Sequence, residues 1–158
     1  MPKNDSAATA EAPCPQEFSI VGIGASAGGL EACSALLKNL PLDTGLAFVV
    51  IQHLDPNHES MLPKLLARVT KIPIKTVQDG MAVEPNQVYV MPPNWEIVFS
   101  EGVLRLIPRE KTSAGTHMPI DGFFRSLAES CQHRAIGVIL SGTGSAGALG
   151  LDWITTEA

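Results

Sequence analysis

The sequence has few charged and few aromatic residues, which make up 17% and 5% of its 158 positions. Acidic residues number 16 and basic residues 11, so the formal net charge is −5. Nucleic acids and anionic membranes are bound by concentrated basic surfaces, so neither is expected as a main partner. No apolar run reaches the roughly 18 residues of a membrane helix, and the N-terminus has no basic region followed by an apolar stretch of the secretory kind. We therefore expect a cytoplasmic protein that does not insert into membranes.

Cysteine is scarce too, with Cys14, Cys33 and Cys131 as its only occurrences. Their number is odd and their spacing does not match that of metal ligands, so we expect no metal site, and the sequence indicates no cofactor. Reduced thiols fit a cytosolic compartment. At this length a single core can bury roughly two thirds of the surface of the unfolded chain, so one domain can fold without disulfides or metals.

The chain divides into a short tail and one domain. Residues 1–16 are rich in Ala, Pro, Ser and Asn without periodicity, which predicts a flexible tail, and the domain is expected over residues 17–158. Apolar runs of strand length occur at residues 18–23, 46–51 and 135–140, and residues 72–77 and 87–91 are two further short strand candidates. Apolar residues at helical spacing occur at 30–40, 61–69, 123–127 and 149–154. A β-hairpin is predicted from residues 96–99 and 103–107, which a Gly-containing loop separates.

Continuously apolar strands are typical of parallel sheets that helices cover on both faces. Alternation of such strands with helices predicts an α/β fold with a doubly wound, mostly parallel sheet, helices on both faces and an added β-hairpin. In such sheets ligands bind at the carboxyl ends of the strands. Three predicted strand ends continue into unusual sequence, at residues 22–29, 51–56 and 141–147. A parallel sheet would bring Ser26 and His53 of these segments to one edge.

One interpretation of this edge is a serine hydrolase. Ser26 follows a strand in a Gly-rich turn that precedes a helix, where small neighbours let a substrate approach and the helix N-terminus favours negative charge. His53 would act as the general base that takes the hydroxyl proton. Backbone N–H groups at Ala27 and in residues 142–144 could form an oxyanion hole.

A second interpretation is a dinucleotide-binding turn. Gly22, Gly24 and Ala27 fit the Gly-x-Gly-x-x-Ala fingerprint between a strand and a helix. That fingerprint also needs an acidic residue at the end of the second strand, whereas the nearest acid here is Asp55, beyond His53. The motif alone supports both interpretations about equally, and a Gly-rich packing turn without chemistry is a third.

Five segments, in order, carry a family resemblance: GIGASAGGLEA, VIQHLDPNHESMLPKLLARVT, DGMAVEPNQVYVMPPN, HMPIDGFFRSLAE and AIGVILSGTGS. From about residue 18 to the C-terminus, the sequence resembles the CheB-type methylesterase domain of bacterial chemotaxis, most closely the module that opens fused CheB/CheR proteins. The resemblance implies a doubly wound α/β fold with a hairpin, and hydrolysis of glutamyl methyl esters on the cytoplasmic helices of chemoreceptors. It also implies glutamine deamidation in related members, and a fused or separate methyltransferase as a further partner.

The resemblance assigns roles residue by residue. Ser26 matches the family nucleophile and His53 matches the family base. The backbone N–H groups of Ala27 and Thr143 match the oxyanion hole. Ala146 stands where the family has the Asp of its catalytic triad.

An alanine cannot fix the histidine tautomer or stabilise the imidazolium ion, so we expect weak or absent hydrolysis. The sequence leaves three explanations of Ala146 open. It is an engineered substitution, or it marks a natural receptor-binding module of the same fold without efficient catalysis, or another carboxylate such as Asp121 or Asp152 reaches His53.

The resemblance also bears on the C-terminus. Related domains continue past the helix after the last Gly-rich turn into at least one more strand. We therefore expect the domain in this chain to lack an edge element of its sheet.

Overall fold

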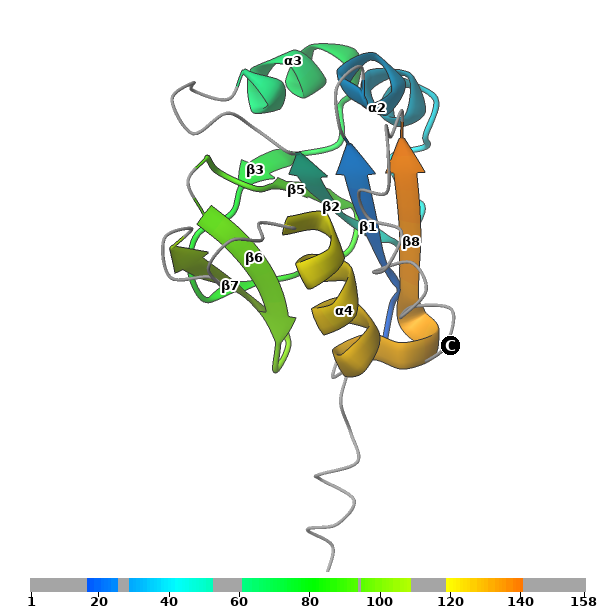
Figure 1. Ribbon diagram of the computed structural model, residues 1–158. Helices are drawn as coiled ribbons and strands as arrows, with labels where there is room; N and C mark the ends of the chain where they lie inside the picture. Colours follow the sequence, from blue (N-terminus) through cyan, green and yellow to red (C-terminus); the bar gives the residue numbers. More distant parts are fainter. Residues whose placement is uncertain (1–16, 26–28, 53–60, 94, 109–118, 141–158) are drawn as a thin grey trace, which may run out of the picture.

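The computed structural model describes residues 17–25, 29–52, 61–93, 95–108 and 119–140 (Figure 1). Its centre is a five-stranded parallel sheet with the order β3-β5-β2-β1-β8. The strands are β1 (Ile20–Ala25), β2 (Ala47–Gln52), β3 (Ile74–Thr76), β5 (Gln87–Val90) and β8 (Ala135–Leu140). All five were predicted as strands from the sequence, and β8 has the predicted bounds. The order places β1 and β2 inside the sheet, which is why nearly every residue of these two strands is buried.

Two helices of the described part of the chain cover one face of the sheet. Helix α2 (Gly29–Lys38) follows β1, and helix α3 (Leu62–Val69) precedes β3. Leu62 and Leu66 are one helical turn apart, so both point from α3 into the core, and Pro63 lies in the first turn, where its missing N–H costs no hydrogen bond. Cys33 and Leu37 of α2 share the same apolar cluster with β1, β2 and β5. Helical spacing in the sequence predicted both helices.

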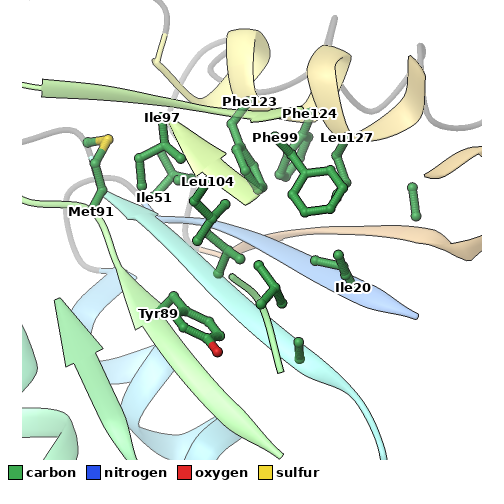
Figure 2. Close-up of a cluster of buried hydrophobic side chains, with 14 of the residues drawn as sticks. Ile20, Ile51, Tyr89, Met91, Ile97, Phe99, Leu104, Phe123, Phe124 and Leu127 are labelled. Atoms are coloured by element: carbon green, nitrogen blue, oxygen red, sulfur yellow. The ribbon is translucent and has the colours of Figure 1, made fainter. Parts of the chain in front are cut away.

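The opposite face is covered by helix α4 (Pro119–Cys131) and by a small antiparallel sheet (Figure 1). That sheet contains β4 (Met81–Ala82), β6 (Trp95–Ser100) and β7 (Val103–Pro108), in the order β4-β7-β6. Figure 2 shows the core between the layers, in which aromatic side chains of α4 meet the hairpin and the parallel sheet. The helices and the hairpin confirm the predicted α/β class with helices on both faces. Strand β4 was not predicted, since two residues are too short for any periodicity.

The β6–β7 hairpin turns at two residues with positive φ, Glu101 at 52° and Gly102 at 83°. Ser100 pairs with Val103 across this two-residue loop. Positive φ at both central positions is the type I′ geometry, whose twist matches that of the flanking strands. Glycine at the second position adopts it without a steric penalty.

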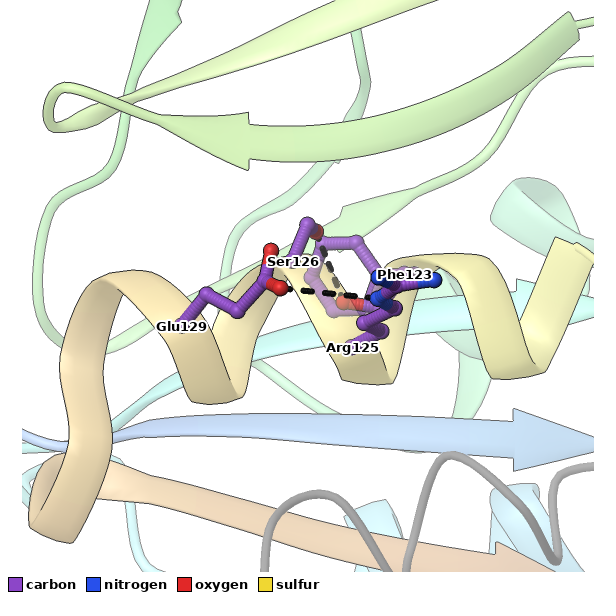
Figure 3. A network of polar contacts seen from close by, with 4 residues as sticks. All are labelled: Phe123, Arg125, Ser126 and Glu129. Carbon is purple, nitrogen blue, oxygen red and sulfur yellow. Dashed lines mark hydrogen bonds and ion pairs between the residues drawn. The ribbon is translucent and has the colours of Figure 1, made fainter. Parts of the chain in front are cut away.

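Two serines of α4 fasten the helix to the edge of β6. The backbone N–H of Phe99 donates to Ser126 Oγ at 2.9 Å, and Ser130 Oγ donates to the Phe99 carbonyl at 3.1 Å. Ser126 Oγ in turn donates to the Phe123 carbonyl at 2.7 Å (Figure 3). An edge strand presents unpaired backbone groups, and here a helix satisfies them. These hydrogen bonds between the serines of α4 and Phe99 of β6, named here the α4–β6 seam, fix where α4 lies over the sheet.

Tyr89 joins the two sheets from the buried face of β5. Its hydroxyl accepts a hydrogen bond from the Glu84 N–H at 2.8 Å and makes a longer one of 3.5 Å to the Ala82 carbonyl. Burial raises the pKa of the phenol, because the charged form loses its hydration. Tyr89 therefore remains a neutral hydrogen-bonding group that attaches the β4 segment to the main core.

Candidate functional site at the carboxyl edge

Three strands end in register at one edge of the parallel sheet. Ala25, the last residue of β1, pairs with Gln52 at the end of β2 and with Leu140 at the end of β8. Neighbouring strands lie roughly 4.8 Å apart, so these three ends span about 10 Å. The three segments expected to carry chemistry, residues 22–29, 51–56 and 141–147, contain or directly follow these strand ends. The prediction that a parallel sheet gathers them at one edge is confirmed for the strand ends themselves.

The predicted site residues themselves lie outside the described residues. This holds for the nucleophile and base, Ser26 and His53, for the oxyanion positions Ala27 and Thr143, and for Ala146. Their roles therefore remain predictions. The structure describes only the strand ends that precede these residues: β1 is the middle of the three strands, so its end at Ala25 lies between the ends of β2 and β8.

The two glycines of the dinucleotide-like motif lie inside β1, where both pair with β2 and β8. A Cβ atom on Gly22 would lie 2.9 Å from Cε1 of Phe124, and one on Gly24 would lie 2.5 Å from Cγ2 of Ile120. Both positions therefore need glycine so that α4 can pack against the strand. In a dinucleotide fingerprint the first glycine forms the turn after the strand. Gly22 and Gly24 lie within β1 instead, so the packing of α4 explains why both residues are glycine.

Asp121 is the one buried charged residue in the described part of the chain, with 8% of its surface exposed. It lies in the first turn of α4, where the partial positive charge of a helix N-terminus favours a carboxylate. Its neighbour Ile120 contacts the backbone of β1 at Gly24, one residue before the strand ends. Asp121 thus lies near the carboxyl edge, as required by the hypothesis that another carboxylate replaces the missing triad Asp. The same position at the start of α4 also fits an acidic residue that only stabilises the helix N-terminus.

A pocket of about 220 Å³ opens at the same edge, beside β3 and β5. Its lining comes from three separate segments: Met61, Pro63 and Lys64 around the start of α3, Thr76 at the end of β3, and Met91, Pro92 and Pro93 after β5. The sequence did not predict this pocket, because no single segment contains it. The Met91 N–H donates to the Val50 carbonyl at 3.1 Å, which holds the wall after β5 against β2, the strand that precedes His53.

The described cysteines do not contribute to the edge. Cys33 is fully buried, and burial raises its pKa from 9.0 to about 11. Cys131, at the end of α4, is 2% exposed. A thiol is reactive as its thiolate, so Cys33 is a packing residue. Among the described residues no group of three or more His, Cys, Asp or Glu side chains could hold a metal ion, and no helix is long and apolar enough to cross a membrane.

A parallel α/β domain with three in-register strand ends at one edge belongs to the class that places its chemistry at the carboxyl ends of strands. The profile of the CheB methylesterase family matches residues 21–157. The chain belongs to the CheB methylesterase family. The crystal structure of the CheB methylesterase catalytic domain from Thermotoga maritima superposes with a TM-score of 0.79 at 26% identity, over 90% of this chain and 77% of that one.

Curated relatives agree with this assignment. A protein-glutamate methylesterase/protein-glutamine glutaminase from Burkholderia lata is 35% identical over 141 residues, which is 88% of this chain and 42% of the relative. One from Yersinia pestis is 32% identical over 152 residues, which is 94% of this chain and 43% of the relative. The chain therefore spans about two fifths of the length of these relatives.

Proposed function

We propose that the chain hydrolyses methyl esters of glutamyl side chains in proteins, with methylated cytoplasmic helices of chemoreceptors as the substrate. Membership of the CheB methylesterase family supports the reaction class. The observation that carries the proposal is the register of Ala25, Gln52 and Leu140. These three strand ends lie side by side, and Ser26, His53 and Thr143 follow them within three residues along the chain, which supports one acyl-transfer site at this edge.

In the proposed reaction, Ser26 Oγ attacks the ester carbonyl carbon while His53 takes the hydroxyl proton. The backbone N–H groups of Ala27 and Thr143 stabilise the oxyanion of the tetrahedral intermediate. The intermediate collapses to an acyl-enzyme, and the methoxide leaves as methanol with the proton from His53. Water, deprotonated by His53, then attacks the acyl carbon, and the second tetrahedral intermediate collapses as His53 returns its proton to Ser26 Oγ. The glutamic acid that forms ionises to the carboxylate and releases one proton to solvent.

Ala146 limits this chemistry in the proposal. A triad carboxylate orients the histidine and stabilises its protonated form, and its loss in serine proteases lowers kcat by roughly 10⁴-fold. Slow turnover, with binding retained, is the expected behaviour of the present sequence. The names of the relatives support a second reaction at the same site, in which a glutamine side chain replaces the ester and ammonia replaces methanol.

Ala146 also favours a competing function, a receptor-binding module that does not turn over its substrate. Methanol release from a helical peptide with one glutamyl methyl ester separates the two. Slow release that is abolished by Ser26→Ala, together with fluorophosphonate labelling at Ser26, supports the esterase. Equal release by both proteins contradicts the assignment of Ser26. No release and no labelling, with peptide binding retained, favours the binding module.

A further inference from the structure

The charges of this acidic chain are unevenly distributed. Residues 60–78 contain four of the 11 basic residues, Lys64, Arg68, Lys71 and Lys75, and none of the 16 acidic ones. This segment covers α3 and β3, which pack against one another at one end of the sheet. The overall net charge of −5 hides this local excess of positive charge.

Three of these cations form a stripe, named here the α3 basic stripe: Lys64, Arg68 and Lys71. Lys64 and Arg68 are four residues apart on α3, on the side opposite the buried Leu62 and Leu66, and Lys71 follows the end of the helix. All three are exposed, and none forms an ion pair in the part of the chain that the structure describes. The stripe is therefore available to a partner.

The stripe begins at the pocket beside β3 and β5, because Lys64 is one of the residues lining it. Apart from Lys64 and Thr76, the lining is entirely methionine and proline. Its volume of about 220 Å³ is below the roughly 300–1,000 Å³ of pockets that enclose small-molecule ligands. A space of this size with one cation at its rim suits a single apolar side chain of a peptide that has carboxylates nearby.

We propose that the pocket and the α3 basic stripe bind an acidic segment of the substrate protein next to the reacting glutamyl ester. One apolar side chain of that segment enters the pocket, and its carboxylates face Lys64 and Arg68. The inference rests on the proposed function, since each ester hydrolysed at the same edge of the sheet leaves one more carboxylate on the substrate. Nucleic acid fits less well, because the pocket has no aromatic side chain on which a base could stack.

The test uses two fluorescent helical peptides that share one glutamyl methyl ester and one leucine. The first peptide has glutamates around the ester and the second has glutamines. Dissociation constants are measured by fluorescence anisotropy at low salt and near 0.15 M salt, where the Debye length falls to about 8 Å. We expect the acidic peptide to bind more tightly than the neutral one, and the difference to shrink as salt rises.

The charge variant is Lys64→Gln/Arg68→Gln, and its matched control is Lys38→Gln/Arg105→Gln, which removes two exposed cations that do not line the pocket. The charge variant should weaken binding of the acidic peptide by about five- to thirtyfold at low salt and leave the neutral peptide unchanged. The control should bind both peptides as the unmodified chain does. Thr76→Phe, which fills the pocket from an exposed position, should weaken both peptides.

The inference is overturned if the two peptides bind equally, or if the control variant loses as much affinity for the acidic peptide as the charge variant does. It is also overturned if a DNA duplex or a phosphatidylserine vesicle binds to the same residues as tightly as the acidic peptide at 0.15 M salt. Methanol release measured in parallel separates this inference from the proposed function. Release from both peptides without any binding difference removes only the docking surface. The expected binding pattern without release, even in the Ala146→Asp protein, removes only the esterase.

Discussion

Gly24 of β1 faces Ile120 of α4 so closely that a Cβ atom at residue 24 would lie 2.5 Å from Ile120 Cγ2. We expect Gly24→Ala to lower the free energy of unfolding by roughly 1–3 kcal/mol, because the added methyl group overpacks the contact. Urea denaturation measures the change. Ile120→Ala removes the opposing atom, so the double variant should lose less stability than the sum of the single ones.

Gly122→Ala is the control for this prediction. Gly122 lies in the interior of α4, and a Cβ atom there meets nothing closer than Glu96 Oε1 at 3.9 Å. Alanine in a helix is favoured over glycine, so this variant should be neutral or more stable by about 0.5–1 kcal/mol. A Gly24→Ala protein as stable as Gly122→Ala would show that β1 does not need glycine there.

The glycines of β1 also show which features of the fold could be predicted from the sequence and which could not. Short apolar stretches in the sequence sufficed to predict the five parallel strands, although only the inner strands are buried along nearly their whole length, whereas β3 and β8 at the two edges are more exposed. The role of Gly22 and Gly24 was not decidable in that way, because it depends on Ile120, Phe123 and Phe124, far along the chain. The motif alone therefore supported a serine hydrolase and a dinucleotide-binding turn about equally, with a packing turn as the third interpretation.

The pocket illustrates the same limit for the site. The carboxyl edge followed from the α/β pattern, and the strand ends at Ala25, Gln52 and Leu140 confirm it. The pocket depends on the strand order, which places the residues after β5 beside β2 and leaves α3 over the end of β3. The net charge did not predict the α3 basic stripe, because a sum of charges over the whole chain contains no information about where the charges lie.

The seam between α4 and β6 gives a second stability prediction. Ser126→Ala leaves the Phe99 N–H without its acceptor, so it should cost about 1–3 kcal/mol of unfolding free energy. On the same helix, Glu129→Gln disrupts only an exposed ion pair with Arg125, whose atoms are 3.4 Å apart (Figure 3). Exposed pairs contribute little, so that variant should stay within about 0.5 kcal/mol of the unmodified protein. Equal effects of the two substitutions would contradict the assigned role of Ser126.

Cys33 should make stability fall at alkaline pH. Its pKa is raised from 9.0 to about 11 in the folded protein, so between these values the unfolded state loses the proton more readily. The stabilisation is complete below pH 9.0 and is lost as pH rises toward 11, by up to about 3 kcal/mol. Unfolding of Cys33→Ala measured over the same pH range should show a shallower decline. Parallel curves for the two proteins would contradict the prediction.

Ala146→Asp should raise the rate of methanol release by roughly 10³- to 10⁴-fold, mainly through kcat, because the new carboxylate orients His53 and stabilises its protonated form. The gain should disappear in Ser26→Ala/Ala146→Asp, which retains the carboxylate but lacks the proposed nucleophile.

Asp121→Asn in the unmodified chain tests the competing explanation that this buried acid already supports His53. If Asp121 does so, Asp121→Asn abolishes the slow release while circular dichroism shows an intact fold, and Ala146→Asp then adds little. If Ala146 is the limiting defect, Asp121→Asn leaves the slow release within a few fold, and the large gain appears only with the aspartate at residue 146.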